Sequence, residues 1–370
     1  MSHLFSPFAL GPLPLRNRIV IAPMCQYSAA DGAATDWHLI HLGHLALSGA
    51  ALLVIEATAV EPAGRITPGC LGLWSDATEA ALQRVLRAVR AHSAMPIAIQ
   101  LGHAGRKASS HVPWQSGMLI PPDQGGWRPV APSALPQLDG EAPPEALDEA
   151  GIERVVQAFA DAARRAHRLG LDAIELHAAH GYLLHQFLSP ISNARTDDYG
   201  GPLANRMRLP LRVFDAVRAA VPAAMPVGVR ISATDWVDGG WDLAQSREFV
   251  LALRPRGLDF VHVSSGGVSP RQKIPLGPGY QVGLAAQLKR ETGVPTIAVG
   301  LITEVEQAEA IVAEGQADLV ALARGMLFDP RWPWHAAAQL GAQVEAPPQY
   351  WRSQPRGSKG LFGDVHIGMR

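Results

Sequence analysis

Short apolar runs recur along the chain, and most are followed by a turn rich in Gly, Ser or His and then by a segment with helical spacing of its apolar residues. This order is typical of β/α units. We predict eight strands, at Ile19–Ala22, Leu52–Ile55, Ile97–Gln100, Ala173–Leu176, Val227–Ile231, Phe260–Val263, Thr296–Val299 and Asp318–Ala321. Eight is the number of strands in a (β/α)8 TIM barrel.

The segments between these strands have the apolar spacing of helices, at Ala77–Ala91, Glu145–Leu169, Leu203–Ala220, Leu243–Leu253, Gly283–Glu291 and Glu304–Glu314. Thr303 and Glu306 have the spacing of a capping box, and Gly170 and Gly315 stand where helices should end. The rival fold is an open doubly wound sheet, which usually has a Gly-rich phosphate turn after an early strand. Here Pro23-Met24-Cys25 follows the first strand, so we predict one TIM barrel over residues 1–370.

Two segments depart from the alternation of strand and helix. The stretch from His103 to Pro144, after the third strand, is long and rich in Pro, Gly, Trp and Ser. Such an insertion is either a functional loop over a site or a solvated excursion without a role, and the residues leave both interpretations open. A C-terminal tail carries aromatic residues, which we expect to pack on a surface: Trp332, Trp334, Tyr350 and Trp351.

The composition is that of a globular protein with a large core. Of the 370 residues 48% are hydrophobic and 18% are charged. The formal net charge is −1 with both signs interspersed, which argues against nucleic acid or a membrane surface as partner. We expect no signal peptide and no membrane span. Two cysteines, Cys25 and Cys70, form no disulfide framework and suit a cytoplasmic protein.

The pattern His177-Ala-Ala-His180-Gly-Tyr182 directly follows the fourth predicted strand, at the end where a barrel carries its active site. If these residues form a helical turn, both imidazoles project to the same side. Three interpretations remain open. The pair could polarise a carbonyl oxygen with Tyr182 as the proton source, bind zinc together with a distant third ligand, or be buried structural histidines.

Glycine-bearing turns follow the last two strands, at Val299-Gly300 and Ala323-Arg324-Gly325. Loops in these positions commonly hold a phosphate group in this barrel, and Arg324 would supply the cation. The alternative is that the glycines only permit tight turns and that Arg324 pairs with a surface carboxylate.

Isolated polar residues at other strand ends are weaker signals. Cys25 alone is typical of a small buried apolar residue, and Tyr27 of a packing residue. Gln100 and Arg230 could hydrogen-bond a polar heterocycle. The residues alone therefore indicate a barrel with a phosphate-bearing ligand and a pair of imidazoles, and they do not identify the cofactor.

An ordered series of motifs resembles the Old Yellow Enzyme family of FMN-dependent ene-reductases, in its thermophilic-like subclass. The matching stretches are Leu15-Arg-Asn-Arg-Ile, Ala22-Pro-Met-Cys-Gln-Tyr27, Gly64-Arg-Ile-Thr, His103-Ala-Gly-Arg-Lys107, His177 to Tyr182, and Arg195-Thr-Asp-Asp-Tyr-Gly-Gly201 with Asn205-Arg206. The resemblance extends from Leu4 to about Arg352.

The resemblance implies that FMN lies across the barrel mouth. Its isoalloxazine ring would lie along Ala22, Pro23, Met24, Cys25 and Ala57. Gln100 and Arg230 would contact the pyrimidine edge, and Gly300, Ala323 and Arg324 would hold the phosphate. The family often has Gly-Arg where this chain has Ala323-Arg324, a change that keeps the backbone N–H.

The resemblance also implies a ping-pong reaction. NADPH or NADH would reduce the flavin, and hydride would then pass from N5 to the β-carbon of an α,β-unsaturated carbonyl or nitro compound. His177 and His180 would hold the substrate oxygen, Tyr182 would protonate the α-carbon, and Tyr27 would contact the substrate. Cys25 would adjust the flavin potential and would not act as a nucleophile.

The resemblance further implies a homodimer, or a tetramer built from dimers. The tail from about residue 336 would lie at the subunit interface, where Arg352, with Trp351, would reach the neighbouring site. A metal-dependent barrel hydrolase with His177 and His180 as ligands is the alternative enzyme. A barrel that stores or senses a flavin or phosphate is the non-enzymatic alternative.

Overall fold

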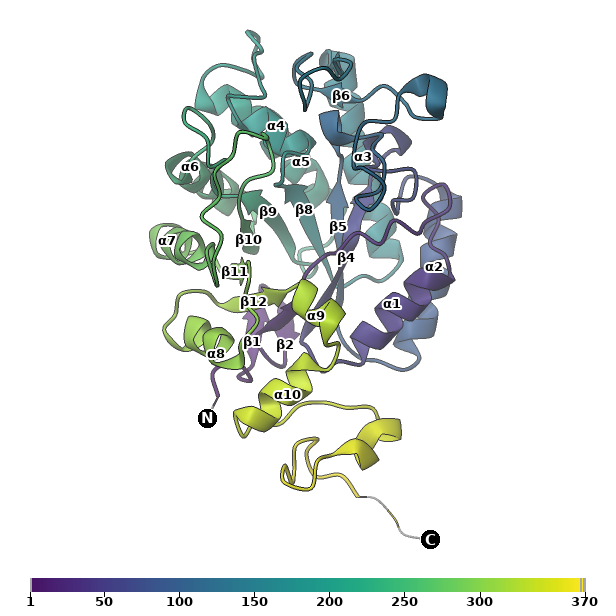
Figure 1. Ribbon diagram of the computed structural model, residues 1–370, viewed down its shortest axis with the longest axis vertical. Coiled ribbons are helices and arrows are strands. Elements are labelled where there is room, and N and C mark those ends of the chain that lie inside the picture. The colour runs from purple at the N-terminus through teal and green to yellow at the C-terminus, as the bar shows by residue number, and fades with distance from the viewer. Residues whose placement is uncertain (1, 367, 369–370) are drawn as a thin grey trace.

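Eight parallel strands form a closed barrel in the computed structural model, which describes residues 2–366 and 368. Strand β12 pairs with β3 and so closes the sheet, which confirms the predicted TIM barrel (Figure 1). In order around the barrel the strands are β3 (Ile19–Ile21), β4 (Leu52–Ala59), β5 (Ile97–Gly102), β8 (Ala173–Ala178), β9 (Val227–Ser232), β10 (Phe260–Ser264), β11 (Thr296–Val299) and β12 (Leu319–Leu322).

All eight predicted strands are confirmed, and several extend further toward their carboxyl ends than the apolar runs indicated. Strand β4 continues to Ala59 and β8 continues to Ala178. These added residues include polar side chains such as Glu56 and His177, which do not look like strand residues in a hydrophobic pattern. The extensions carry polar groups into the mouth of the barrel.

Helices surround the barrel and cover its outer face (Figure 1). The long ones are α1 (Asp36–Ala46), α2 (Asp76–Arg90), α3 (Glu149–Arg168), α5 (Leu203–Ala220), α6 (Leu243–Leu253), α7 (Val282–Thr292) and α8 (Val305–Ala313). Shorter ones are α4 (Leu183–Leu188), α9 (Arg324–Phe328) and α10 (Trp332–Gln339). The sequence pattern did not predict α1, because histidines and a glycine interrupt the spacing of its apolar residues.

Local helix signals were partly right. Gly170 and Gly315 follow α3 and α8 with φ of 68° each, the left-handed conformation that ends a helix. The predicted capping box at Thr303 and Glu306 is wrong, because α8 is preceded by Glu304 and its cap lacks a side-chain hydrogen bond. Thr303 Oγ1 instead donates to the Glu304 carboxylate, at 3.1 Å.

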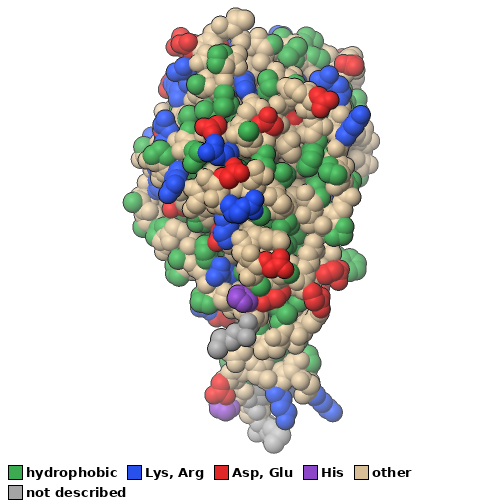
Figure 2. Space-filling view, turned by 90° about the vertical axis from the view of Figure 1, so that its left-hand side faces the viewer, with side chains coloured by type: hydrophobic (Ala, Val, Ile, Leu, Met, Phe, Trp, Pro, Cys, Tyr) green, Lys and Arg blue, Asp and Glu red, His purple; other side chains and the backbone are tan. Residues whose placement is uncertain are grey.

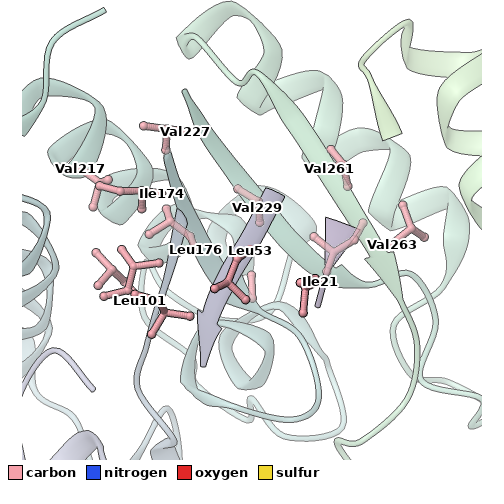
Figure 3. Packing of buried hydrophobic residues seen from close by; sticks show 14 of the residues in the cluster. Ile21, Leu53, Leu101, Ile174, Leu176, Val217, Val227, Val229, Val261 and Val263 are labelled. Atoms are coloured by element: carbon pink, nitrogen blue, oxygen red, sulfur yellow. The ribbon is translucent and has the colours of Figure 1, made fainter. Parts of the chain in front are cut away.

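Strand side chains alternate between the helices outside and the barrel interior. The outward set forms the main core, part of which Figure 3 shows with Val217 of α5 near Ile174 of β8. The inward set begins with a smaller apolar cluster that includes Ala98, Ala173 and Phe260. A hairpin of β1 (Phe8–Leu10) and β2 (Leu13–Leu15) joins this inner cluster through Leu10 and Leu15, at the amino ends of the strands.

The insertion after β5 packs against the barrel. A short pair of strands, β6 (Val130–Ala131) and β7 (Glu145–Ala146), fixes its later half. Arg106 donates to the carbonyl oxygen of Val268, at 2.6 Å, and Trp127 Nε1 donates to that of Ala63, at 3.0 Å. These contacts connect the insertion to loops that follow other strands, so it is not a detached solvated excursion.

The C-terminal tail packs on itself and against the barrel, as its aromatic residues predicted. Trp334 of α10 lies against Phe362, with ring centroids 5.0 Å apart. Trp351 lines a groove with Asn17, Ala51 and Pro96, each of which precedes a barrel strand. The tail therefore lies at the amino-end face of the barrel, and in Figure 1 it extends from the end of the molecule opposite β6.

The surface carries mixed charges. Figure 2 shows Lys and Arg side chains interspersed with Asp and Glu over one face of the molecule. No helix within the described residues is long and apolar enough to span a bilayer.

The packing of α7 predicts the cost of one core truncation. Leu288 of α7 is fully buried, whereas Leu276 in the preceding loop is 72% exposed. We expect Leu288→Ala to lower the free energy of unfolding by about 2–5 kcal/mol, because it leaves a cavity under the helix. Leu276→Ala is the matched control and should change it by less than about 0.5 kcal/mol. Urea unfolding measures both, and equal losses would contradict this assignment of the core.

Candidate active site

The carboxyl ends of the strands bring the predicted site residues together at one mouth. His177 lies in β8, His180 lies in the turn after it, and Tyr182 precedes α4. The expected helical turn is wrong, because His177 is in a strand and His180 adopts a left-handed conformation with φ of 57°. The two rings nevertheless meet edge to face, with centroids 5.1 Å apart.

A chain of hydrogen bonds assigns the tautomers of these imidazoles. The N–H of Ala179 donates to His177 Nδ1, at 3.3 Å, so the ring proton of His177 is on Nε2. His177 Nε2 lies 3.4 Å from His180 Nδ1, and His180 Nε2 lies 2.7 Å from Ser264 Oγ. His180 therefore also carries its proton on Nε2, and each ring has an Nε2–H donor.

Both imidazoles are held in the neutral form. Burial, followed by the positive charge of Arg230, lowers the pKa of His177 and of His180 well below the ordinary value. At neutral pH the pair consequently offers N–H donors without a positive charge. Such donors can bind a carbonyl or nitro oxygen.

Tyr182 lies directly beside this pair. Its ring meets the His177 ring edge to face, with centroids 4.8 Å apart. Burial raises the pKa of Tyr182 well above its ordinary value, so the phenol stays protonated. Among the described residues its hydroxyl has no hydrogen-bond partner. The group is available as a proton donor.

Lys107, from the insertion, holds the turn that carries these residues. Its Nζ donates to the carbonyl oxygens of His180, at 2.9 Å, and Gly267, at 3.0 Å. It also lies 5.1 Å from the centroid of the Tyr182 ring. Burial, followed by the charge of Arg106, lowers the pKa of Lys107 to about 8. The insertion is thus part of the mouth.

A buried network supports the same turn from outside the barrel. The N–H of Gly181 donates to His185 Nδ1, at 2.9 Å, and His185 Nε2–H donates to Asp235, at 2.8 Å. Ser189 also donates to Asp235, at 2.6 Å. Gly181 has φ of 73°, and a Cβ there would lie 2.2 Å from the carbonyl oxygen of Gly267. Only glycine fits this close approach between two loops.

The loop after β3 contributes Cys25 and Tyr27. Burial raises the pKa of Cys25 well above its ordinary value, so the thiol is protonated and a poor nucleophile. Tyr27 has φ of 53° and meets the ring of Trp114 edge to face, with centroids 5.5 Å apart. Trp114 belongs to the insertion, which therefore also contacts this side of the mouth.

Of the other residues expected along the cofactor, Ala22, Pro23 and Met24 directly follow β3 at its carboxyl end, and Ala57 lies in β4. Ala22, after β3, is buried and its N–H donates to Leu322 of β12, at 3.0 Å. Met24 packs against the outer core. A β-bulge between Ile55 and Ala57 bends β4 there. Ala57 then lines a small cavity together with His177 and Tyr182.

A polar layer fills the barrel interior between the apolar cluster and the mouth. It consists of Gln100 of β5, Glu175 of β8, Arg230 of β9 and His262 of β10, all of them buried. Gln100 Nε2 donates to Glu175 Oε1, at 2.7 Å, and His262 Nδ1 donates to Glu175 Oε2, at 2.8 Å. Arg230 Nε has no hydrogen-bond partner among residues 2–366 and 368.

The turns after β11 and β12 offer free backbone donors. Gly300 has φ of 119°, and Ala323 directly precedes α9. Within the described residues, no backbone hydrogen bond uses the N–H of Gly300, Ala323 or Arg324. Arg324 is exposed and forms no ion pair with a described carboxylate. Free backbone N–H groups beside an unpaired arginine can together bind a phosphate group.

These residues fit a flavin mononucleotide. The buried guanidinium of Arg230, with an unpartnered Nε, needs an electron-rich acceptor, and the free N–H groups of two neighbouring turns need an anion. An isoalloxazine with a phosphate on its side chain supplies both.

Arg352 is the one predicted site residue that lies elsewhere. It is exposed in the tail, next to Trp351 at the amino-end face of the barrel. It therefore does not belong to the mouth of its own subunit. No cluster of three or more His, Cys, Asp or Glu side chains in the described part of the chain could hold a metal ion.

A parallel barrel with these donors at its mouth fits a flavin-binding enzyme, and comparison with known proteins identifies the family. The chain belongs to the NADH:flavin oxidoreductase / NADH oxidase family, whose model matches residues 3–343. An NADPH dehydrogenase of Geobacillus thermodenitrificans is 45% identical over 351 residues, 94% of this chain and 98% of that protein. One of Listeria innocua is 43% identical over 355 residues, 95% and 99% of the two chains.

Solved structures agree with this assignment. Morphinone reductase superposes with a TM-score of 0.75 at 31% identity, over 94% of this chain and 92% of that one. A morphinone reductase complex with tetrahydroNAD superposes with a TM-score of 0.74. The Old Yellow Enzyme resemblance is confirmed. The chain is an NAD(P)H-dependent oxidoreductase with FMN as cofactor, which excludes the metal-dependent hydrolase and the non-enzymatic barrel.

Three groups of site residues were missed in the sequence: Glu175 with His262, Lys107, and His185 with Asp235. Glu175 and His262 each stand between apolar residues inside a predicted strand, and a charged or ionisable residue there signals a buried polar layer. Lys107 belongs to the motif His103–Lys107, but the sequence alone indicated no role for this residue. His185 and Asp235 are 50 residues apart, and no local pattern relates them.

The lowered pKa of Lys107 predicts a dependence of stability on pH. Lys107 loses its proton near pH 8 in the folded protein, whereas its ordinary pKa of 10.5 applies in the unfolded chain. Between these values the unfolded chain binds more protons at Lys107 than the folded protein does, so the contribution of Lys107 to stability should rise with pH, by up to about 3 kcal/mol. We expect Lys107→Met to remove this rise in urea unfolding measured from about pH 7.5 to about pH 10.

The control for this series is Lys289→Met. Lys289 lies at the amino-end face of the barrel, with Nζ 3.0 Å from the Asp318 carboxylate. The rise should persist in this variant. A rise that also persists in Lys107→Met would show that Lys107 is not the group that titrates.

Proposed function

We propose that the chain is an FMN-dependent ene-reductase acting on activated alkenes, α,β-unsaturated carbonyl or nitro compounds. The observation that carries this proposal is the pair of neutral imidazoles, His177 and His180, beside the protonated phenol of Tyr182. Bound FMN would supply the hydride chemistry, taking hydride from NADPH or NADH and delivering it from N5 to the β-carbon of the alkene in a ping-pong reaction.

The imidazole pair binds and polarises the substrate. In the structure the Nε2–H groups of His177 and His180 face His180 Nδ1 and Ser264 Oγ. A bound carbonyl or nitro oxygen would replace these acceptors and accept both hydrogen bonds, which draws electron density from the double bond and makes its β-carbon electrophilic. Because both rings are neutral, the pair does not repel the cation of Arg230. Tyr27, with Trp114 beside it, forms the opposite wall for the substrate.

Tyr182 supplies the proton that completes the reduction. Its raised pKa keeps the proton on the phenol until charge develops on the α-carbon. Cys25, as a neutral thiol, contacts the flavin and adjusts its potential. Gln100 and Arg230 contact the pyrimidine edge, and Gly300, Ala323 and Arg324 hold the phosphate. The likeness to morphinone reductase supports this class of reaction.

The two half-reactions test this assignment. In stopped-flow mixing, NADPH should bleach the bound flavin at nearly the same rate in wild type and in Tyr182→Phe. Reoxidation by cyclohexenone should be slower in the variant, by about 100-fold or more, because only this step needs the proton.

Tyr199→Phe is the matched control. The Tyr199 hydroxyl accepts a hydrogen bond from Arg212 on α5, away from the mouth, so both half-reactions should keep their rates. Equal losses in both half-reactions of Tyr182→Phe would refute its role as proton donor. A bound flavin that NADPH never bleaches would refute the proposed function.

We also propose that the protein acts as a homodimer that completes each site, with Arg352 and Trp351 contributed by the neighbouring tail. Apolar side chains are exposed on adjacent elements, Trp37 and Ile40 on α1 and Phe328 on α9, and Phe328 is 93% exposed. Arg331, which follows α9, donates to the carbonyl oxygen of His44 in α1 and so joins these elements. Exposed apolar patches of this kind support protein association.

The mass of the assembly in solution and the affinity for a phenolic ligand test this dimer together. Phe328→Glu should convert the dimer to a monomer in sedimentation, because it places a charge in an apolar interface. Arg352→Ala should weaken binding of a phenolic ligand by about tenfold while the dimer persists. The double variant should lose no more affinity than Phe328→Glu alone.

Arg356→Ala, which removes another exposed arginine of the tail, serves as the control and should leave the affinity unchanged. A monomeric Phe328→Glu protein with full affinity would show that each site is complete within one chain.

A further inference from the structure

A carboxylate is buried inside the barrel, directly below the mouth. Glu175 has no solvent-exposed surface, and neither does His262, which faces it from β10. Their strand positions place both side chains on the inward face. His262 is in register with Arg230 on β9, and Glu175 is in register with Gly228, two residues before Arg230 on the same strand. The proposed reaction uses neither residue.

The surroundings of Glu175 compensate for the burial of its charge. An isolated charge inside a protein costs several kcal/mol and persists only with partners. Glu175 accepts hydrogen bonds from Gln100 and His262, and the Arg230 guanidinium lies close enough to stabilise its charge. His262 Nε2, by contrast, has no partner among the described residues, so the imidazole bonds to the carboxylate alone.

We propose that Glu175 and His262 form a positioning pair that orients Gln100 toward the flavin and sets the flavin reduction potential through Arg230. The proposal rests on the assignment of Gln100 and Arg230 to the pyrimidine edge of FMN. Neither Glu175 nor His262 touches the reacting atoms.

The orientation of Gln100 follows from hydrogen-bond chemistry. An ionised carboxylate only accepts hydrogen bonds, so Gln100 must present its NH2 group to Glu175. Its Oε1 then remains as an acceptor, and it makes no hydrogen bond with a described residue. The flavin pyrimidine ring carries an N–H donor at N3, which matches an acceptor in this place. Glu175 therefore selects the amide orientation that the ring requires.

The charge of Glu175 acts on the flavin through Arg230. The positive guanidinium favours the negative charge that the pyrimidine edge of FMN acquires on reduction. Glu175 partly offsets that positive charge, because it is buried in the same low-dielectric layer. The pair thus lowers the preference of the site for reduced FMN, and the flavin remains a better hydride donor to the alkene.

His262 keeps the carboxylate ionised without adding charge of its own. Burial lowers the pKa of His262, so the ring is neutral and donates from Nδ1. The groups that face Glu175 are Gln100 from β5, Arg230 from β9 and His262 from β10, with His177 two residues along its own strand. Of these only Arg230 is charged at neutral pH, so loss of the imidazole bond should raise the pKa of Glu175.

The test is a redox-dye titration of the holoenzyme, which needs neither NADPH nor an alkene. Glu175→Gln keeps the shape and removes the charge. Its amide oxygen can still accept from the Gln100 NH2 group, and its own NH2 group can donate to His262 Nδ1 if the neutral imidazole adopts its other tautomer. We expect the ratio of FMN dissociation constants, oxidised over reduced, to rise by about tenfold, which raises the midpoint potential by about 30 mV for a two-electron couple. An unchanged potential would overturn the proposal.

His262→Leu gives an independent measurement if Glu175→Gln fails to retain FMN. At high pH its potential should equal that of wild type. As the pH falls Glu175 should take up a proton. The ratio of FMN dissociation constants, oxidised over reduced, should then rise about tenfold above the wild-type ratio at the same pH, and the midpoint potential should rise with it. A potential that follows wild type at every pH would overturn the role of the pair.

The amide orientation has its own readout. Titration of the apoprotein with oxidised FMN, followed by loss of flavin fluorescence, should show weaker binding for Glu175→Leu by about tenfold. In a Gln100→Ala background the same change should have little further effect. Additive losses would overturn the positioning of Gln100.

Asp318→Asn is the matched control. Asp318 is a partly buried carboxylate that accepts from the Thr296 N–H at the amino ends of the strands. It should change the stability and leave the flavin potential unchanged. If the variants show the expected shifts of potential relative to wild type but cyclohexenone does not reoxidise the reduced wild-type protein, the proposed function fails and the inference about Glu175 stands.

Discussion

Closure of the parallel sheet is the constraint on which the rest of the structure depends. Because β12 pairs with β3, every inward side chain enters one narrow interior, and every strand presents its carboxyl end at the same mouth. The lower part is filled by apolar residues such as Phe260 and Ala173. The upper part must accept the side chains that reach a ligand, so polar groups stack directly on an apolar floor.

Because the polar groups are packed together in this layer, each charge acts on its neighbours with little screening by solvent. Burial, reinforced by the Arg230 guanidinium, lowers the pKa of His177 and His180, and the same guanidinium stabilises the Glu175 carboxylate. One buried cation therefore helps to keep two imidazoles neutral, and in the proposed site it would also favour electrons on the flavin. The substrate and cofactor halves of the site are coupled through this charge, because little water separates them.

The sequence predicted what depends on local pattern, and it missed what depends on closure. The eight apolar runs and the order of strand and helix defined the barrel, and the strand ends located His177, His180 and Tyr182. The contact of His180 with Ser264 joins residues 84 positions apart, and that of Glu175 with His262 spans 87. No periodicity encodes such pairs, since only barrel closure brings them together. The left-handed conformation of His180 was missed for the same reason: the surrounding loops impose it.

The insertion gives the site a part that the barrel alone lacks. Lys107 and Trp114 come from the same segment and reach opposite sides of the mouth, one at the His180 turn and the other at Tyr27. Arg106 connects this segment to the loop after β10, so the positions of these contacts depend on each other. The barrel positions His177 on a strand and the His180–Tyr182 turn directly after it, while the insertion packs over the mouth. Under the proposed function, a change of insertion sequence would therefore alter the choice of substrate without moving the residues that carry the reaction.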